Sequence, residues 1–147
     1  MMDISILGAT EVDVNFNGNV ITHSDGYLLH GIGGWQNCLH AKNVILPVPL
    51  TRRGIPIIRD EVTTIVGPGE LIDVIVTEFG IAINPKRVDL LEKLKDSDLP
   101  IKAIEELRDE AERICGKPER PVFTDKIVAA VKWVDGTVID VVRQVIE

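Results

Sequence analysis

The segment spanning residues 30–38 reads HGIGGWQNC, with glycines at Gly31, Gly33 and Gly34. Glycine lets a ligand approach the backbone, because no Cβ stands in the way. The amides of Gly34 and Trp35 would lie at the start of a short helix-like piece over residues 35–42. There they could hold a phosphate, a carboxylate or a tetrahedral oxyanion. The alternative is a tight strand-to-helix turn without a ligand, and the glycine pattern alone leaves both interpretations open.

A second polar segment, DVNFNGNV over residues 13–20, contains Asn15, Asn17 and Asn19. Asparagine amides could hydrogen-bond a carboxylate-rich substrate. More often, such a run is a polar turn whose side chains satisfy their own backbone. The spacing by itself favours the turn.

Two further candidates carry charge. Glu78 follows the most apolar strand expected in the chain, the place where open α/β sheets keep ligand-binding loops. It could act as an acid or base, but a lone glutamate there is more often a structural hydrogen-bond acceptor. Arg52 and Arg53 could bind a carboxylate or phosphate bidentately. A solvated pair of loop residues is an equally good interpretation.

Common catalytic signatures are missing from the sequence. The histidines His23, His30 and His40 lack metal-ligand spacing such as HxxxH or HExxH, so no metal is expected. Nothing matches GxSxG, a P-loop, or a strand-linked GxGxxG followed by an acidic residue. The chemistry must therefore come from another kind of site.

The composition restricts the class of protein. The chain has 147 residues, 45% of them hydrophobic, which fits one folded domain over residues 1–147. Its net charge of −7 is spread along the sequence and argues against nucleic acid as the main partner. No apolar run is long enough to span a membrane, and the start shows no secretory leader. With only Cys38 and Cys115, a reduced cytoplasmic setting is expected.

The elements that position these candidates alternate in type. Apolar, β-branched runs predict strands over residues 4–7, 20–22, 44–46 and 72–77, with a turn at Asp25-Gly26. Helices are expected over residues 85–95, opened by Asn84-Pro85, and over residues 103–115, ended by Gly116. Residues 127–134 and 137–142 predict a C-terminal β-hairpin with Asp135-Gly136 at its turn. This order indicates an α/β fold with an open, mainly parallel sheet, flanking helices and that hairpin.

The inner faces of the two helices follow from helical spacing. Val88, Leu91 and Leu94 would share the buried face of the first helix. The second helix would bury Ile104, Leu107, Ala111 and Ile114. On its outer side, Asp109 and Arg113 could pair one turn apart.

Taken together, these segments resemble the citrate lyase α-subunit family. The resemblance covers nearly the whole chain and rests on LGA at 7–9, FNGNV at 16–20, THSDG at 22–26, VTEFGIAINP at 76–85 and DGTVIDVVRQV at 135–145. The last block is the most discriminating one, because other coenzyme A transferases share the earlier features. Two departures from the family pattern stand out: Gly18 replaces a usual valine, and Trp35 follows the glycine pair where the family usually has histidine.

The resemblance implies a coenzyme A transferase-like fold and exchange of acetate for citrate on an acyl-carrier-protein thioester. It also implies an oligomer with the β subunit and the γ (acyl carrier) subunit, or with an upstream half of the α subunit. The acyl carrier would supply a coenzyme A-like prosthetic group, with none bound covalently to this chain. The candidate substrate- or coenzyme A-binding residues are Gly31, Gly33, Gly34, Trp35, Asn17, Asn19 and Glu78.

The catalytic residue stays unassigned. In the wider family a glutamate attacks the thioester, and its motif precedes the LGA strand, so that role is not carried over to Glu78. We therefore expect the chain to be the carboxy-terminal part of such a transferase, with an incomplete active site by itself. Two alternatives remain open: a non-catalytic assembly or binding module derived from that fold, and a coenzyme A transferase for another small carboxylate.

Overall fold

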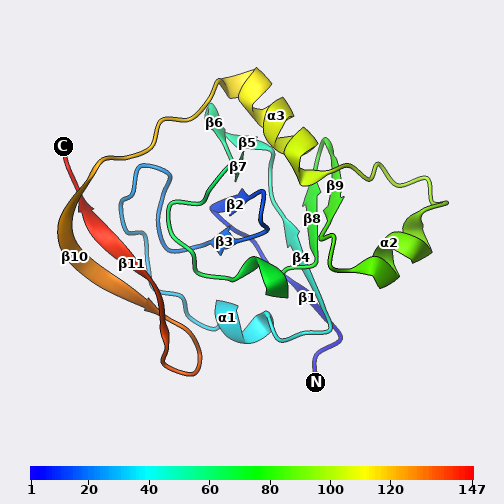
Figure 1. Cartoon of the computed structure of the whole chain (residues 1–147), viewed down its shortest axis with the longest axis horizontal. Helices are drawn as coiled ribbons and strands as arrows, with labels where there is room; N and C mark the ends of the chain where they lie inside the picture. The colour runs from blue at the N-terminus through cyan, green and yellow to red at the C-terminus, as the bar shows by residue number, and fades with distance from the viewer.

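The computed structural model describes all 147 residues, and its largest sheet contains four strands (Figure 1). In spatial order these are β1 (Ile4–Ile6), β4 (Asn43–Pro47), β8 (Val74–Thr77) and β9 (Gly80–Ile83). The prediction that residues 4–7, 44–46 and 72–77 contribute strands to one sheet is confirmed, although β8 begins only at Val74. Val44, Leu46 and Ile75 are fully buried, as their continuous apolar character requires.

The sheet is mixed, so the expected mainly parallel sheet is found only in part. β1, β4 and β8 run parallel, but β9 returns antiparallel to β8. The reason is local: Thr77 pairs with Gly80, which leaves only Glu78 and Phe79 to connect the strands. A two-residue connection can join only antiparallel strands.

A second, three-stranded sheet is also mixed. It has the order β3 (Gly18–Asn19), β2 (Glu11–Asp13) and β7 (Ile58–Arg59). The strand expected over residues 20–22 is absent, because the Asn19 side chain takes over its hydrogen bonding: Asn19 Oδ1 accepts from the amides of Ile21 and Thr22. Nearby, β5 (Thr51–Arg52) and β6 (Ile55–Pro56) form a small hairpin.

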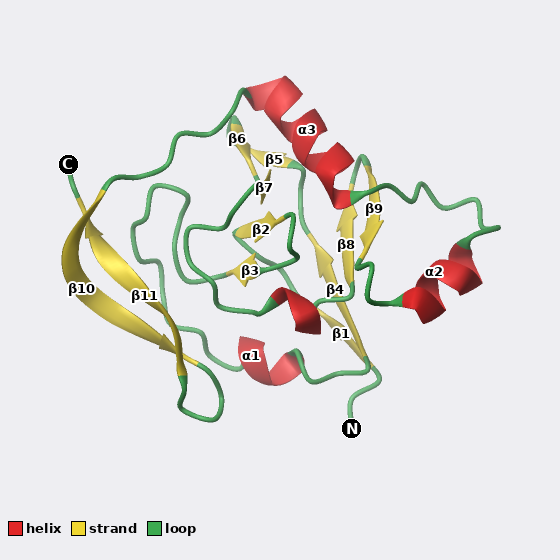
Figure 2. Ribbon diagram, viewed as in Figure 1, coloured by secondary structure: helices red, strands yellow, loops and turns green.

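The helices are shorter than expected at their starts or ends. They are α1 (Trp35–Cys38), the 3-10 turn η1 (Gly69–Leu71), α2 (Val88–Leu94) and α3 (Ile104–Cys115). Instead of capping a helix, Asn84 closes a turn through the Lys86 amide, so α2 starts later. No residue of α2 is buried, so the expected inner face of Val88, Leu91 and Leu94 is wrong: Val88 and Leu91 are exposed, and Leu94 is only half-buried. Figure 2 shows α2 at the edge of the molecule. None of these helices is long and apolar enough to cross a membrane.

Helix α3 matches its prediction closely. Ile104, Leu107 and Ala111 are buried in the main hydrophobic cluster, while Ile114 is exposed. Gly116 ends the helix with φ of +79°. The expected pair between Asp109 and Arg113 does not form. Arg113 pairs with Glu110 instead, and Asp109 pairs with Arg108.

The C-terminal segment forms the two longest strands. β10 (Phe123–Lys132) and β11 (Val138–Val145) pair antiparallel, and Gly136 in their connection has φ of +90°. Val131 and Val142 pack into the main hydrophobic cluster. The rest of the two strands curves along one side of the molecule (Figure 2).

Candidate functional site

The glycine loop, residues 31–34, is open on its outer side. A Cβ added at Gly31, Gly33 or Gly34 would meet no atom within 4 Å. Gly33 has φ of +60°, whereas Gly34 has φ of −90°, so only Gly33 needs the conformational freedom of glycine. The Trp35 amide donates to the Ile32 carbonyl at 3.3 Å, but the amides of Gly33 and Gly34 have no acceptor within the chain.

Trp35 turns inward from this loop. Its indole Nε1 donates to the Gly8 carbonyl at 2.9 Å. The ring lies against two glycines: a Cβ at Gly67 would come within 2.5 Å of the ring, and one at Gly18 within 2.9 Å. The indole thus anchors the glycine loop onto the second sheet. It also borders a cavity of about 260 Å³, the glycine-loop cavity, lined by Gly8, Ala9, Thr10, Val20, His30, Ile32 and Trp35.

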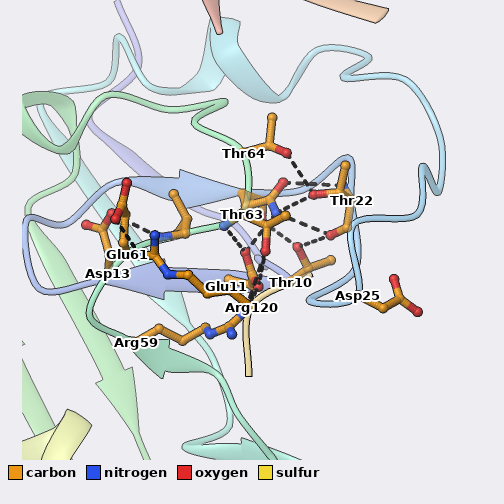
Figure 3. A network of polar contacts seen from close by, with 12 residues as sticks. Thr10, Glu11, Asp13, Thr22, Asp25, Arg59, Glu61, Thr63, Thr64 and Arg120 are labelled. Carbon is orange, nitrogen blue, oxygen red and sulfur yellow. Dashed lines mark hydrogen bonds and ion pairs between the residues drawn. The ribbon is translucent and has the colours of Figure 1, made fainter. Parts of the chain in front are cut away.

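Asn19 is buried and belongs to a polar network. Figure 3 labels other members of this network, among them Glu11, Thr22 and Thr63. Its Nδ2 donates to Glu11 Oε2 at 2.9 Å and to Thr22 Oγ1 at 2.8 Å. The Glu11 carboxylate also forms an ion pair with Arg59 and accepts from the amide and hydroxyl of Thr63 at 2.7 and 2.9 Å. The Glu11 and Arg59 side chains are both almost fully buried. Their pairing is required, because an unpaired buried charge is strongly destabilising.

The network holds Thr10 in place. The Thr10 hydroxyl lies 2.9 Å from the carbonyl oxygens of Asn19 and Thr22. Asn19 therefore acts through other residues: it positions Thr10, which lines the glycine-loop cavity, and its own side-chain amide is hydrogen-bonded within the chain.

Asn17 is also used internally. Its Nδ2 donates to Asp13 Oδ2 at 3.2 Å, and its Oδ1 accepts from the Gly69 amide at 2.9 Å. Burial raises the pKa of the Asp13 carboxyl above its usual value, although hydrogen bonds from Asn17 and from the Val62 amide oppose the shift. The turn interpretation of this asparagine-rich segment fits these contacts.

Glu78 lies apart from the glycine loop, after β8. Its carboxylate oxygens accept from the Leu50 amide at 2.9 and 3.2 Å. Leu50 directly precedes the hairpin of β5 and β6. Glu78 thus fastens the base of that hairpin, a structural acceptor role.

The hairpin carries Arg52 and Arg53 into a second cavity, of about 410 Å³. This arginine-turn cavity is lined by Thr10, His23, Ser24, Asp25, Arg52, Arg53, Ile55 and Ile57. Thr10 lines both cavities, so the glycine loop and the arginine turn lie on either side of it. Sequence reasoning noticed the arginines but gave no role to Thr10 or His23; only their nearness to the LGA and THSDG motifs marked them.

The predicted site residues therefore fall into two groups, those at or near the glycine-loop cavity and those bonded elsewhere. Trp35 lines the glycine-loop cavity, whereas Gly31, Gly33 and Gly34 only adjoin in sequence its lining residues His30, Ile32 and Trp35. Asn19 does not line the cavity, but its backbone carbonyl accepts from Thr10, which does. Asn17 and Glu78 do not reach it with their polar atoms, which are bonded elsewhere. Whether these residues bind substrate stays a prediction.

Comparison with known proteins gives a consistent family. The family model described as citrate lyase, alpha subunit (CitF), matches residues 1–145. The citrate lyase alpha chains of Klebsiella pneumoniae and Haemophilus influenzae are 43% and 46% identical over 145 residues, which is 98% of this chain. These 145 residues make up only 28% and 29% of those relatives.

A solved structure agrees with the sequence comparisons. It is the crystal structure, in complex with citrate, of a Streptococcus mutans protein described as the alpha subunit of citrate lyase. The TM-score is 0.96 at 48% identity, over 99% of this chain and 29% of that one. On this agreement of sequence and fold, the chain belongs to the citrate lyase α-subunit family.

Proposed function

We propose that this chain forms part of a citrate coenzyme A-transferase, which exchanges acetate for citrate on an acyl-carrier-protein thioester. Family membership supports the reaction, and the related Streptococcus mutans protein was crystallised with citrate. The observation that carries the proposal is the glycine loop: the amides of Gly33 and Gly34 are unpaired, and they lie in sequence between Ile32 and Trp35, which line a small, largely apolar cavity.

The chain's residues fit the end of a coenzyme A-like prosthetic group. Since no side chain would meet a group approaching Gly31, Gly33 or Gly34, the backbone there is accessible to a thioester. Ala9, Val20, Ile32 and Trp35 give the neighbouring cavity an apolar wall suited to an alkyl arm. When bound, the group would supply the acyl thioester, whose thiolate is a good leaving group.

The chain's own contribution would be electrostatic and positional. Backbone amides aimed at a thioester oxygen stabilise the negative charge that develops on it during acyl transfer. Trp35 holds the loop in place through its bond to Gly8. No attacking group is assigned, because Glu78 is committed to the Leu50 amide. We propose that the nucleophile lies elsewhere in the full-length subunit, of which this chain covers only a part.

One observation favours a second candidate, a non-catalytic assembly module. The Trp35 ring fills space next to Gly18 and Gly67 that a smaller side chain would leave to a ligand. In that case the glycine loop would not take part in acyl transfer.

The discriminating experiment combines this chain with the remaining part of an α subunit and an acetylated acyl carrier. Mass spectrometry then follows replacement of the acetyl group by citryl when citrate is added. We expect no exchange by the chain alone and citrate-dependent exchange by the combination. Gly34→Val should abolish exchange while the melting temperature stays close to that of the parent chain, because Gly34 has negative φ and open space around it.

A control places the same valine side chain at an exposed strand position. Ala130→Val in β10 should leave both exchange and melting temperature unchanged. Exchange that survives Gly34→Val would remove the loop from the reaction and favour the assembly module.

A further inference from the structure

Two neighbouring arginines lack a partner in an otherwise well-paired molecule. Every other arginine of the chain binds an acidic side chain or a backbone carbonyl, as Arg87 does with Asp73 and Asp89. The guanidinium groups of Arg52 and Arg53 form no hydrogen bond or ion pair, although the chain has a net charge of −7. Two unpaired guanidinium groups side by side repel each other, so an anion between them would be stabilising.

The backbone displays these arginines in a tight turn. Arg52 pairs with Ile55 across the hairpin, which leaves Arg53 and Gly54 as its two-residue connection. Both have positive φ, +51° and +76°, as a type I′ turn requires. Asparagine or glycine suits the first of these positions better than arginine. Arginine at position 53 is thus not explained by the folding of the hairpin.

The surrounding cavity suits a small, polar ligand. Its volume of about 410 Å³ lies within the range typical of ligand pockets. His23 and Ser24 line it and offer further hydrogen-bonding groups. Its one acidic wall residue, Asp25, already accepts from the Tyr27 amide at 3.0 Å. The charge of the wall is therefore dominated by the two arginines.

We propose that the arginine-turn cavity is a polycarboxylate subsite, in which Arg52 and Arg53 bind carboxylates of citrate. Guanidinium and carboxylate match each other's planar, two-pronged geometry, which favours this pairing over other anions. The proposal rests on citrate being the acyl acceptor, as inferred above. Thr10 lines both cavities, so citrate held here would extend one end toward the glycine loop.

Titration calorimetry of citrate into the 147-residue chain tests the subsite directly. The variants Arg52→Gln and Arg53→Asn should each weaken citrate binding at least about tenfold, the loss expected for one charge-assisted hydrogen bond. Arg53→Asn should keep or raise the melting temperature, since asparagine tolerates positive φ better. The melting temperature of Arg53→Asn therefore shows whether weaker citrate binding comes from loss of stability. We expect no such loss.

Lys126→Gln serves as the charge-matched control, because Lys126 is an exposed cation on β10 whose amine has no partner. It should leave citrate affinity unchanged. Acetate and inorganic phosphate are titrated as competitors, and both should displace citrate only at much higher concentrations.

The proposal is overturned if the parent chain does not bind citrate, if both arginine variants bind it normally, or if phosphate competes as well as citrate does. The last result would indicate a site for the phosphates of the prosthetic group. Because the readout is equilibrium binding, it is independent of acyl exchange. Citrate binding without exchange would contradict only the proposed function, and exchange with unchanged citrate affinity in both variants would contradict only the subsite.

Discussion

Gly18 and Trp35 depart from the family pattern at two distant positions, and the structure places them in contact. A Cβ at Gly18 would lie 2.9 Å from the Trp35 ring and 3.2 Å from Ile72 Cδ1. The large ring thus occupies the space that a valine at position 18 would need. We predict that the two departures are coupled, so that Gly18→Val costs less stability when Trp35 is already alanine.

The magnitudes follow from packing. Replacing a buried tryptophan by alanine costs about 3–5 kcal/mol. Trp35 is only half-buried but loses its bond to Gly8 as well, so about 3 kcal/mol is expected for Trp35→Ala. Gly18→Val alone overpacks the site and should cost about 1–3 kcal/mol. In the double variant the valine side chain partly fills the vacated space, which should make it about 2 kcal/mol more stable than the sum of the single effects.

Urea denaturation of the parent chain, both single variants and the double variant measures this coupling. Trp133→Ala combined with Gly18→Val is the control pair. The atoms nearest to a Cβ at Gly18 belong to Trp35 and Ile72, whereas the Trp133 ring packs near His40. That pair should be additive. Additivity within about 0.5 kcal/mol for Gly18 and Trp35 themselves would refute the packing argument.

Three other perturbations test the framework of the site. Gly33→Ala should destabilise the fold by about 1 kcal/mol in a thermal melt, because φ of +60° strains any residue with a Cβ. Glu11→Ala should cost about 3–5 kcal/mol in urea denaturation, since it leaves the Arg59 charge buried without its partner. Arg108 lowers the pKa of the Asp60 carboxyl, so the stability from this pair is present above about pH 4 and is lost as the pH falls through the lowered value. Asp60→Asn should therefore make stability less dependent on pH in acid.

Each of these expectations has a contrary result. An unchanged melt for Gly33→Ala would mean that the loop does not hold its positive φ in solution. A small cost for Glu11→Ala would show that water reaches Arg59. An equally steep acid transition in Asp60→Asn would assign the loss of stability to other carboxylates.

Local sequence patterns correctly predicted the elements that are buried through a continuous apolar run or through helical spacing of apolar residues. Val44 and Leu46 in β4, and Leu107 in α3, are buried as continuous apolar character and helical spacing require. The errors came where side chains compete with the backbone. Asn19 captures the amides that a strand at 20–22 would have used, and Asn84 closes a turn instead of capping a helix.

The site was visible only in parts. The glycine loop and the arginine pair stood out in the sequence, because their residue types suit anions. Their meeting at Thr10 depends on long-range pairing between segments that no local pattern encodes. The same holds for the inward turn of Trp35, which required glycine at two positions far along the chain.

Steady-state kinetics with both substrates tests the two-cavity account most directly, using the chain combined with the remaining α-subunit part. Arg52→Gln should raise KM for citrate about tenfold and leave KM for the acetylated carrier unchanged. Gly34→Val should instead abolish turnover, even at saturating citrate. If both variants alter the same parameter, or if neither alters any, then citrate and thioester are not bound on the two sides of Thr10 as proposed.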